Sequence, residues 1–397
     1  MIPKSKWPNY DGKILSKISK LLQSGKTNYL VGKEGLLFEK NFSKFYKIKF
    51  ANAVANASLG LELSLLSLNF NKGDEVIVTP RSYHSSVSCV IRAGLTPVFA
   101  DVDRQTMNIC PKSIRKNISK KTKAIMLINV LGISSNLFEI SQLAKKNKLT
   151  IIEDNCESLG SRLKSKYLGT FGDFASFSFY YSHQITSGEG GMVVCKKKED
   201  YDILFALRSH GWLGGTRFYK RNLSLYKSYA KKNPQLDPRY IFINSGFNLR
   251  PTDISAAIGY SQFKKLNKFK KIRQQNRNKI ISSLVNSKNW SNQFSFLEPI
   301  ENLQPSWFGF PIVLRKDLAG KKNQLLEKLK RKNIETRPII SGNFLNQPSV
   351  DLYNLNSEKK VLKNCQELED RGFFIGLHTI PISKESLNHL TSNLLEI

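Results

Sequence analysis

Residues 176–195 read SFSFYYSHQITSGEGGMVVC, and the interpretation of the whole chain starts from them. An apolar run at 176–181 is followed by a polar turn around His183, a glycine cluster and a second apolar run at 192–195. Two short strands joined by a glycine-rich loop predict backbone that a ligand can approach closely. Small hydroxyl residues beside such glycines can bind a phosphate. Because an imidazole titrates near neutrality, we expect His183 to be the residue of this loop that moves protons.

Apolar runs alternate with amphipathic stretches through the first half of the chain. The runs that we expect to be strands are residues 51–55, 75–79, 97–102, 124–130 and 150–153. This alternation is typical of an α/β protein with a mainly parallel sheet, in which ligands bind at the carboxyl ends of the strands. A chain of 397 residues suggests more than one unit. We expect a large domain at 1–265 and a smaller one at 266–397, joined by a Lys-rich helix near 261–285.

The chain is strongly basic, with 62 Lys and Arg against 31 Asp and Glu and a formal net charge of +31. Such a charge can indicate a nucleic-acid partner. Here the lysines are spread over predicted surface helices and no nucleic-acid motif accompanies them, so we expect no nucleic acid among the partners. A positive field would instead attract an anionic small substrate.

Two further features of composition limit the class of protein. Five cysteines lie far apart without CxxC spacing, which favours free thiols over disulfides or a metal site. No apolar run reaches about 18 residues, and the N-terminus does not resemble a signal peptide. We therefore expect a soluble cytoplasmic protein with no membrane span.

The stretch at 176–195 resembles the active-site loop of the DegT/StrS sugar-nucleotide aminotransferases, which are pyridoxal-phosphate (PLP) enzymes of fold type I. In that family a lysine stands five residues after a serine; here Ser178 begins the pattern and His183 occupies the lysine position. A lysine bonds covalently to the cofactor and moves protons, whereas an imidazole can only move protons. The resemblance implies a large domain with a mainly parallel seven-stranded sheet and a smaller α+β C-terminal domain.

One branch of this family, the sugar 3-dehydratases, has the same replacement. The resemblance therefore implies a pyridoxamine-phosphate enzyme that removes the 3-hydroxyl of a nucleotide diphosphate 4-keto-6-deoxy sugar in surface polysaccharide or lipopolysaccharide biosynthesis. L-Glutamate would regenerate the amine cofactor. Some dehydratases also carry an iron–sulfur cluster, for which the scattered cysteines offer no ligand set. An aminotransferase with an unusual histidine and a non-catalytic paralogue remain alternatives.

Several polar residues follow predicted strands, where a ligand is expected. Ser58 and Leu59 open a helix whose free N–H groups suit a phosphate, and the alternative is that Ser58 is only a helix cap. Tyr83 follows a strand and could be a core aromatic or a stacking partner, with His84 as its neighbour and competitor. Asp154 ends a buried strand.

The family resemblance implies a role for each candidate residue. Asp154 would hold the pyridine nitrogen, Glu157 would lie near the phenolic oxygen, and Tyr83 would stack on the ring. Phosphate contacts would come from Ser58, Leu59 and Ser178. His210, in the sequence LRSHG, would donate a proton or a hydrogen bond.

The resemblance also implies a homodimer. In it, Asn248 would bind the phosphate of the other subunit's cofactor, and Arg250 would bind a carboxylate such as that of glutamate. Residues 342–348 resemble the stretch that closes the pocket in the dehydratase branch.

Overall fold

A seven-stranded sheet forms the centre of the computed structural model, which describes residues 8, 10–25, 32–213, 223–355 and 362–396. All neighbouring strands are parallel except β9, which runs antiparallel to both of its neighbours. The predicted mainly parallel seven-stranded sheet is therefore confirmed. In spatial order the strands are β1 (Phe50–Val54), β9 (Gly191–Cys195), β8 (Phe174–Ser178), β5 (Thr150–Asp154), β4 (Thr122–Ile128), β2 (Glu75–Val78) and β3 (Thr96–Phe99).

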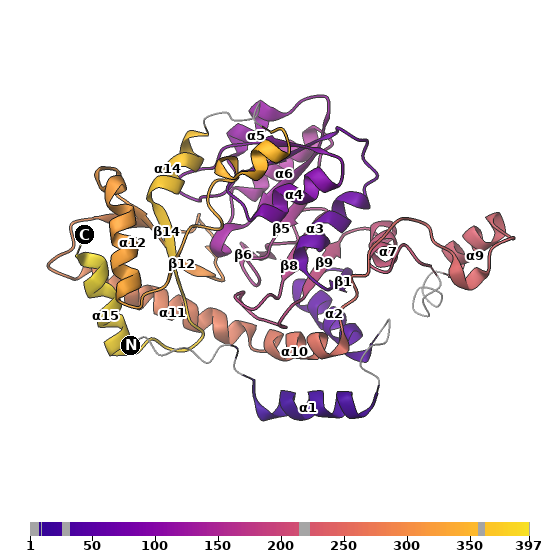
Figure 1. Cartoon of the computed structure of the whole chain (residues 1–397), viewed down its shortest axis with the longest axis horizontal. Coiled ribbons are helices and arrows are strands. Elements are labelled where there is room, and N and C mark those ends of the chain that lie inside the picture. The colour runs from indigo at the N-terminus through magenta and orange to yellow at the C-terminus, as the bar shows by residue number, and fades with distance from the viewer. Residues whose placement is uncertain (1–7, 9, 26–31, 214–222, 356–361, 397) are drawn as a thin grey trace.

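Both faces of this sheet are buried, and the alternation of side chains decides which helices cover each face. Along β9, Met192 and Val194 join an aromatic cluster on one face, while Val193 and Cys195 join the larger core on the other. The aromatic cluster includes side chains of α2 (Lys33–Tyr46) and α10 (Asp253–Phe263), and the larger core includes those of α3 (Ala57–Leu66), α4 (His84–Arg92) and α6 (Leu137–Lys146). Figure 1 shows these two helical layers.

The C-terminal part contains its own sheet. The helix α11 (Leu266–Val285) leads into it, as the Lys-rich segment predicted (Figure 1). The sheet is antiparallel, with the strand order β10 (Phe294–Phe296), β12 (Gly309–Leu314), β14 (Gly372–Gly376) and β13 (Thr336–Arg337). It is accompanied by α12 (Lys322–Arg331), α14 (Lys363–Arg371) and α15 (Lys384–Leu395). The predicted boundary at 265/266 stays a prediction, although it falls immediately before α11.

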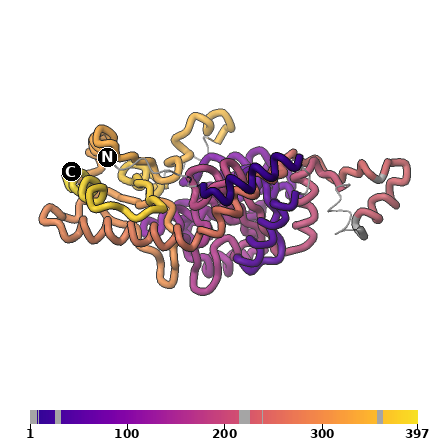
Figure 2. Tube along the Cα trace, turned by 90° about the horizontal axis from the view of Figure 1, so that it is seen from below, coloured from indigo at the N-terminus to yellow at the C-terminus, as the bar shows by residue number. Residues whose placement is uncertain are grey.

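Three peripheral elements complete the fold. The helix α1 (Gly12–Gln23) packs on α10, and a small sheet pairs β11 (Leu303–Gln304) with β6 (Arg162–Leu163) and β7 (Lys166–Tyr167). Beyond α7 (Lys198–Leu207), the helix α9 (Leu223–Lys232) projects away from the body (Figures 1 and 2). Within the described ranges, no helix is long and apolar enough to cross a membrane.

Candidate active site

The loop between β8 and β9 is held in shape by its backbone. The strand predicted at 176–181 ends earlier, at Ser178, because the chain turns there and leaves Tyr180 and Tyr181 about half exposed. The His183 N–H donates to the Tyr180 carbonyl at 3.1 Å within this turn. At the other end of the loop, a Cβ on Gly191 would lie 2.8 Å from the Ala57 nitrogen. Only glycine allows β9 to approach the start of α3 so closely.

His183 has a half-buried ring, with its Nδ1 atom fully enclosed and without a hydrogen-bond partner among the described residues. The ring packs edge-on against Phe308, with centroids 5.3 Å apart. Burial, assisted by the charge of Arg273, lowers the pKa of His183 to about 3. The imidazole is therefore neutral near pH 7, which is the form that can accept a proton.

Gln184 anchors the histidine loop to its surroundings. Its fully buried side-chain amide donates to the carbonyls of Glu157 and Ser306, the latter at 3.2 Å. These bonds tie the loop to the segment after β5 and to the segment before β12. The position of the imidazole thus depends on a residue with no titratable group.

Asp154 ends β5 with only 5% of its surface exposed. Its Oδ2 accepts a hydrogen bond from the Ser86 hydroxyl at 2.5 Å, and its Oδ1 accepts one from the Cys156 N–H at 3.2 Å. The Ser86 N–H in turn donates to the Tyr83 carbonyl at 3.1 Å. One turn of α4 therefore connects the carboxylate to the predicted stacking residue.

Glu157 lies one turn beyond the end of β5. Its Oε2 accepts a hydrogen bond from the Leu131 N–H at 2.8 Å, and the Leu131 carbonyl accepts one from the Phe308 N–H at 3.2 Å. Burial, together with the negative charge of Asp154, raises the pKa of Glu157 to about 7. The turn at Leu131 thus links Glu157 to Phe308, which packs on His183.

The N-terminus of α3 lies beside the ends of β8 and β9. Ser176 Oγ donates to the Ala57 carbonyl at 3.0 Å, and Ser178 lies two residues further along the same strand. The helix cap is Asn56, whose Oδ1 accepts from the Leu59 N–H at 3.0 Å, so the cap alternative for Ser58 was wrong. Ser58 stands in the first turn, where helix N–H groups have no intrahelical acceptor.

Tyr83 and His84 are distinguished by their environments. Tyr83 is 62% exposed, which excludes the core alternative for this ring in the single chain. His84 instead packs against Phe344, and its Nε2 is 3.3 Å from the Ser349 hydroxyl. Of the two, Tyr83 is free to stack on a ligand.

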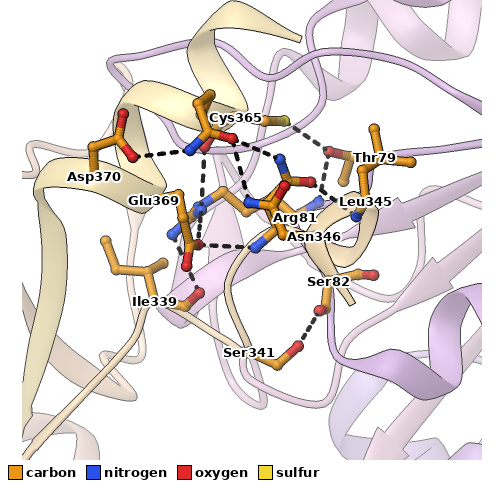
Figure 3. A network of polar contacts seen from close by, with 12 residues as sticks. Thr79, Arg81, Ser82, Ile339, Ser341, Leu345, Asn346, Cys365, Glu369 and Asp370 are labelled. Atoms are coloured by element: carbon orange, nitrogen blue, oxygen red, sulfur yellow. Dashed lines mark hydrogen bonds and ion pairs between the residues drawn. The ribbon is translucent and has the colours of Figure 1, made fainter. Parts of the chain in front are cut away.

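A buried arginine fastens the loop after β2 to the C-terminal part (Figure 3). Arg81 is fully buried; its Nη1 lies 3.4 Å from Glu369 Oε2 and its Nη2 donates to the Ile339 carbonyl at 3.3 Å. Beside it, the Ser341 hydroxyl donates to the Ser82 carbonyl at 2.6 Å. The segment predicted to close the pocket continues directly from these contacts.

His210, Asn248 and Arg250 form a second group. The His210 N–H donates to the Phe247 carbonyl at 2.9 Å, and Arg250 Nη2 donates to Asn248 Oδ1 at 2.8 Å. His210 and Asn248 are both exposed. A backbone bond of 2.8 Å from the N–H of Ala55 to the carbonyl of Leu249 connects this group to the end of β1.

The described chain brings the other predicted site residues together around β5, β8 and α3: Ser58, Leu59, Tyr83, Asp154, Glu157, Ser178 and His183. Sequence reasoning did not find that Ser86, Phe308 and Gln184 hold these residues in place. Ser86 lies one helical turn after Tyr83, so helical spacing could have found it. Phe308 and Gln184 act through contacts between distant segments, for which the sequence carries no local signal.

The arrangement fits a pyridoxal- or pyridoxamine-phosphate group. The start of α3 and Ser178 can receive a phosphate, and the buried carboxylate of Asp154 can hold a ring nitrogen in its protonated form. Residues 179–190 contain no lysine that could bond to the cofactor. No three His, Cys, Asp or Glu side chains among the described residues are grouped so that they could hold a metal ion.

This fold and site define a PLP-dependent enzyme of the aminotransferase fold. Residues 8–394 match the DegT/DnrJ/EryC1/StrS aminotransferase family, and the chain belongs to it. The GDP-4-keto-6-deoxy-D-mannose 3-dehydratase of Escherichia coli O55:H7 is 33% identical over 356 residues, covering 88% of both chains.

Solved structures agree with the sequence comparison. The E. coli GDP-4-keto-6-deoxy-D-mannose 3-dehydratase with bound hydrated PLP superposes with a TM-score of 0.86 and 31% identity, covering 97% of both chains. A GDP-4-keto-6-deoxymannose 3-dehydratase with a trapped PLP–glutamate adduct gives 0.83 and 29%, covering 97% of this chain and 98% of that one. The predicted family, fold and cofactor class are confirmed, while the roles of the individual residues stay predictions.

Proposed function

We propose that the protein is a pyridoxamine-phosphate-dependent 3-dehydratase of a nucleotide-linked 4-keto-6-deoxyhexose. The observation that carries this proposal is His183, a neutral imidazole with an enclosed, unpartnered Nδ1 among the described residues, in a loop without lysine. Such a site can move a proton but cannot tether the cofactor covalently. The 3-dehydratases among the relatives support the same assignment.

Each polar group would have one task. Asp154, fixed by Ser86, would hold the pyridine nitrogen, and Ser58 and Ser178 would bind the phosphate. His183 would take a proton from the cofactor methylene and hold it at an imidazole nitrogen. When bound, pyridoxamine phosphate supplies the amine that condenses with the 4-keto group and the ring that accepts electrons as the 3-hydroxyl leaves.

The partners follow from the same chemistry. The relatives' names support GDP as the nucleotide and glutamate as the amino donor. One relative, from Salmonella typhimurium, is named a lipopolysaccharide biosynthesis protein, which supports a role in the synthesis of surface polysaccharide or lipopolysaccharide. We place this reaction in the cytoplasm. We also propose a homodimer. The projecting region around α9 is followed by the exposed Tyr240 and Phe242, at 61% and 54%, and exposed aromatic surface of this kind favours association.

Product analysis tests the proposal. The protein is incubated with pyridoxamine phosphate, L-glutamate and a panel of GDP-, CDP- and dTDP-linked 4-keto-6-deoxy sugars, and the products are identified by mass spectrometry. We expect a 3-deoxy ketosugar. An aminosugar that retains its 3-hydroxyl would establish the aminotransferase alternative, and an absence of both products would favour the non-catalytic one.

The variant His183→Lys gives a complementary test. We expect it to show the visible absorbance of a lysine-linked cofactor. We also expect it to lose dehydration, since the lysine amine would bond to the cofactor carbon that otherwise carries the free amine. A lysine-linked cofactor in the unmodified protein would contradict the proposal.

A further inference from the structure

A cavity of about 620 Å³ opens beside the histidine loop. Tyr181 and Ser182 form part of its wall, and Phe308, which packs on His183, forms another part. The opposite wall is C-terminal and includes the turn after β14. The cavity therefore connects the proposed proton-transfer residue with the C-terminal part of the chain.

Arg273 of α11 lines this cavity although only 5% of its surface is exposed. Its Nε donates to the Leu377 carbonyl at 3.0 Å, which fixes the plane of the guanidinium. No carboxylate forms an ion pair with it in the described part of the chain, whereas the equally buried Arg208 and Arg277 pair with Glu39 and Glu298. A buried cation without a counter-charge is costly.

The groups around Arg273 do not compensate its charge. His378 lines the same cavity, and its pKa is lowered by burial and by the charge of Arg273. Glu335 is the acid in the cavity lining, and its carboxylate lies 2.8 Å from Arg337. Arg337 lines the cavity as well. The field in the cavity is therefore positive, and the two Nη groups of Arg273 are the donors that Leu377 leaves unused.

We propose that Arg273 is the centre of an oxyanion-binding subsite that takes a carboxylate or phosphate group of a substrate beside His183. A guanidinium whose Nε is already bonded still presents a pair of N–H groups that suits either oxyanion. The identity of the bound group rests on the proposed function, which offers two sources. One is the carboxylate of the amino donor, and the other is the diphosphate of the nucleotide sugar. Arg250, to which the family resemblance assigns the carboxylate, lies in the separate group with His210 and Asn248.

Binding of two unreactive probes tests the proposal. Glutarate has the carbon skeleton of the amino donor without its amino group, and GDP lacks the sugar. Each is titrated calorimetrically into the full chain loaded with pyridoxamine phosphate, as the unmodified protein, Arg273→Met and Arg273→Lys. We expect Arg273→Met to weaken one probe about tenfold or more, since charge-assisted bidentate bonds are the strong ones. Loss for glutarate identifies the carboxylate source, and loss for GDP the phosphate source.

The stability of the variants separates binding from a structural role. Arg273→Met removes an unpaired buried charge, which favours folding, and also the hydrogen bond to the Leu377 carbonyl, which opposes it, so the unfolding midpoint should change little. The matched control, Arg277→Met, one turn along α11, removes a paired arginine and should lower the midpoint without changing either affinity. Should Arg273→Met not fold, Arg273→Lys decides, since a lysine cannot present the paired donors and should bind the probe several-fold more weakly.

Wild-type affinity of the Arg273 variants for both probes would overturn the subsite. Because neither probe reacts, this result is independent of dehydration. A protein that fails to dehydrate but loses probe binding on substitution of Arg273 would refute the proposed function and retain the subsite.

Discussion

The two groups of predicted site residues differ in how far one chain completes them. The group around β5 and β8 is enclosed: Asp154 is held by Ser86, and Gln184 anchors the loop of His183. In the second group, His210 and Asn248 are exposed, Arg250 is partly buried, and the group is attached mainly through its backbone. The enclosed group has the geometry of a preformed site, whereas the second group, with two exposed members, has the geometry of residues that meet a ligand or a second chain.

The largest effect should come from the centre of the enclosed group. Replacing His183 by Asn removes the proposed proton carrier, and general acid–base catalysis contributes about 10²- to 10⁴-fold, so dehydration should fall by that factor. Rates are measured by product formation, and retained cofactor binding is checked by absorbance. The control His84→Asn alters a histidine that contacts Ser349 and should change the rate little. Retention of activity by His183→Asn would place proton transfer elsewhere.

The pH dependence of the same variant adds a second readout. The pKa of His183 is about 3 in the folded chain and would be near 6.5 in the unfolded one. The unfolded chain therefore binds the proton first as the pH falls below 6.5, and the stabilisation contributed by the neutral ring is lost between pH 6.5 and 3. His183→Asn should remove this part of the acid dependence in urea unfolding.

A mixed dimer tests whether the second group completes the site of another chain. Asn248→Asp places a negative charge where a phosphate is expected and should inactivate the protein, as is also expected of His183→Asn. If each site combines His183 of one copy with Asn248 of the other, mixing the two variants after unfolding and refolding should restore about a quarter of wild-type activity, since half of the dimers are mixed and carry one intact site.

A matched pair provides the control for that experiment. In the proposal, His183 and Asp154 belong to the same copy, so mixing His183→Asn with Asp154→Asn should restore nothing. Activity recovered in the mixture of His183→Asn and Asp154→Asn would contradict this division of the site between two copies. So would an absence of recovery in the mixture of His183→Asn and Asn248→Asp.

The sequence predicted the residues of the enclosed group better than the residues that hold them in place. Asp154 and Ser178 end buried strands, and the parallel sheet brings strand ends together, so local pattern was sufficient to place them. The Gln184 bonds to Glu157 and Ser306 join segments 27 and 122 residues away, and such contacts depend on the complete fold. Likewise, Arg273 is one basic residue among many on α11, and only the structure shows that no acid pairs with it in the described ranges.

The smallest expected effect concerns Glu157, at the edge of the enclosed group. Its pKa is about 7 in the folded chain against an ordinary value of 4.5, because of burial and the charge of Asp154. The folded chain therefore retains a proton that the unfolded chain releases, so the contribution of this group to stability is complete below pH 4.5 and is lost as the pH rises through 7. Gln is neutral and similar in shape, and its side-chain oxygen can still accept the N–H of Leu131.

Glu157→Gln should match the unmodified protein at about pH 4 and exceed its free energy of unfolding at pH 8 by about 1–3 kcal/mol, given about 1.4 kcal/mol for each pKa unit. Urea unfolding without cofactor at both pH values measures the difference, and Glu189→Gln, an exposed acid of the histidine loop, is the control. An equal free energy at pH 8 would mean that Glu157 ionises as readily in the folded chain as in the unfolded one. Glu157 and Asp154 would then lie close together as two charged carboxylates. A bound cation, such as a protonated pyridine ring, would be needed to offset their repulsion.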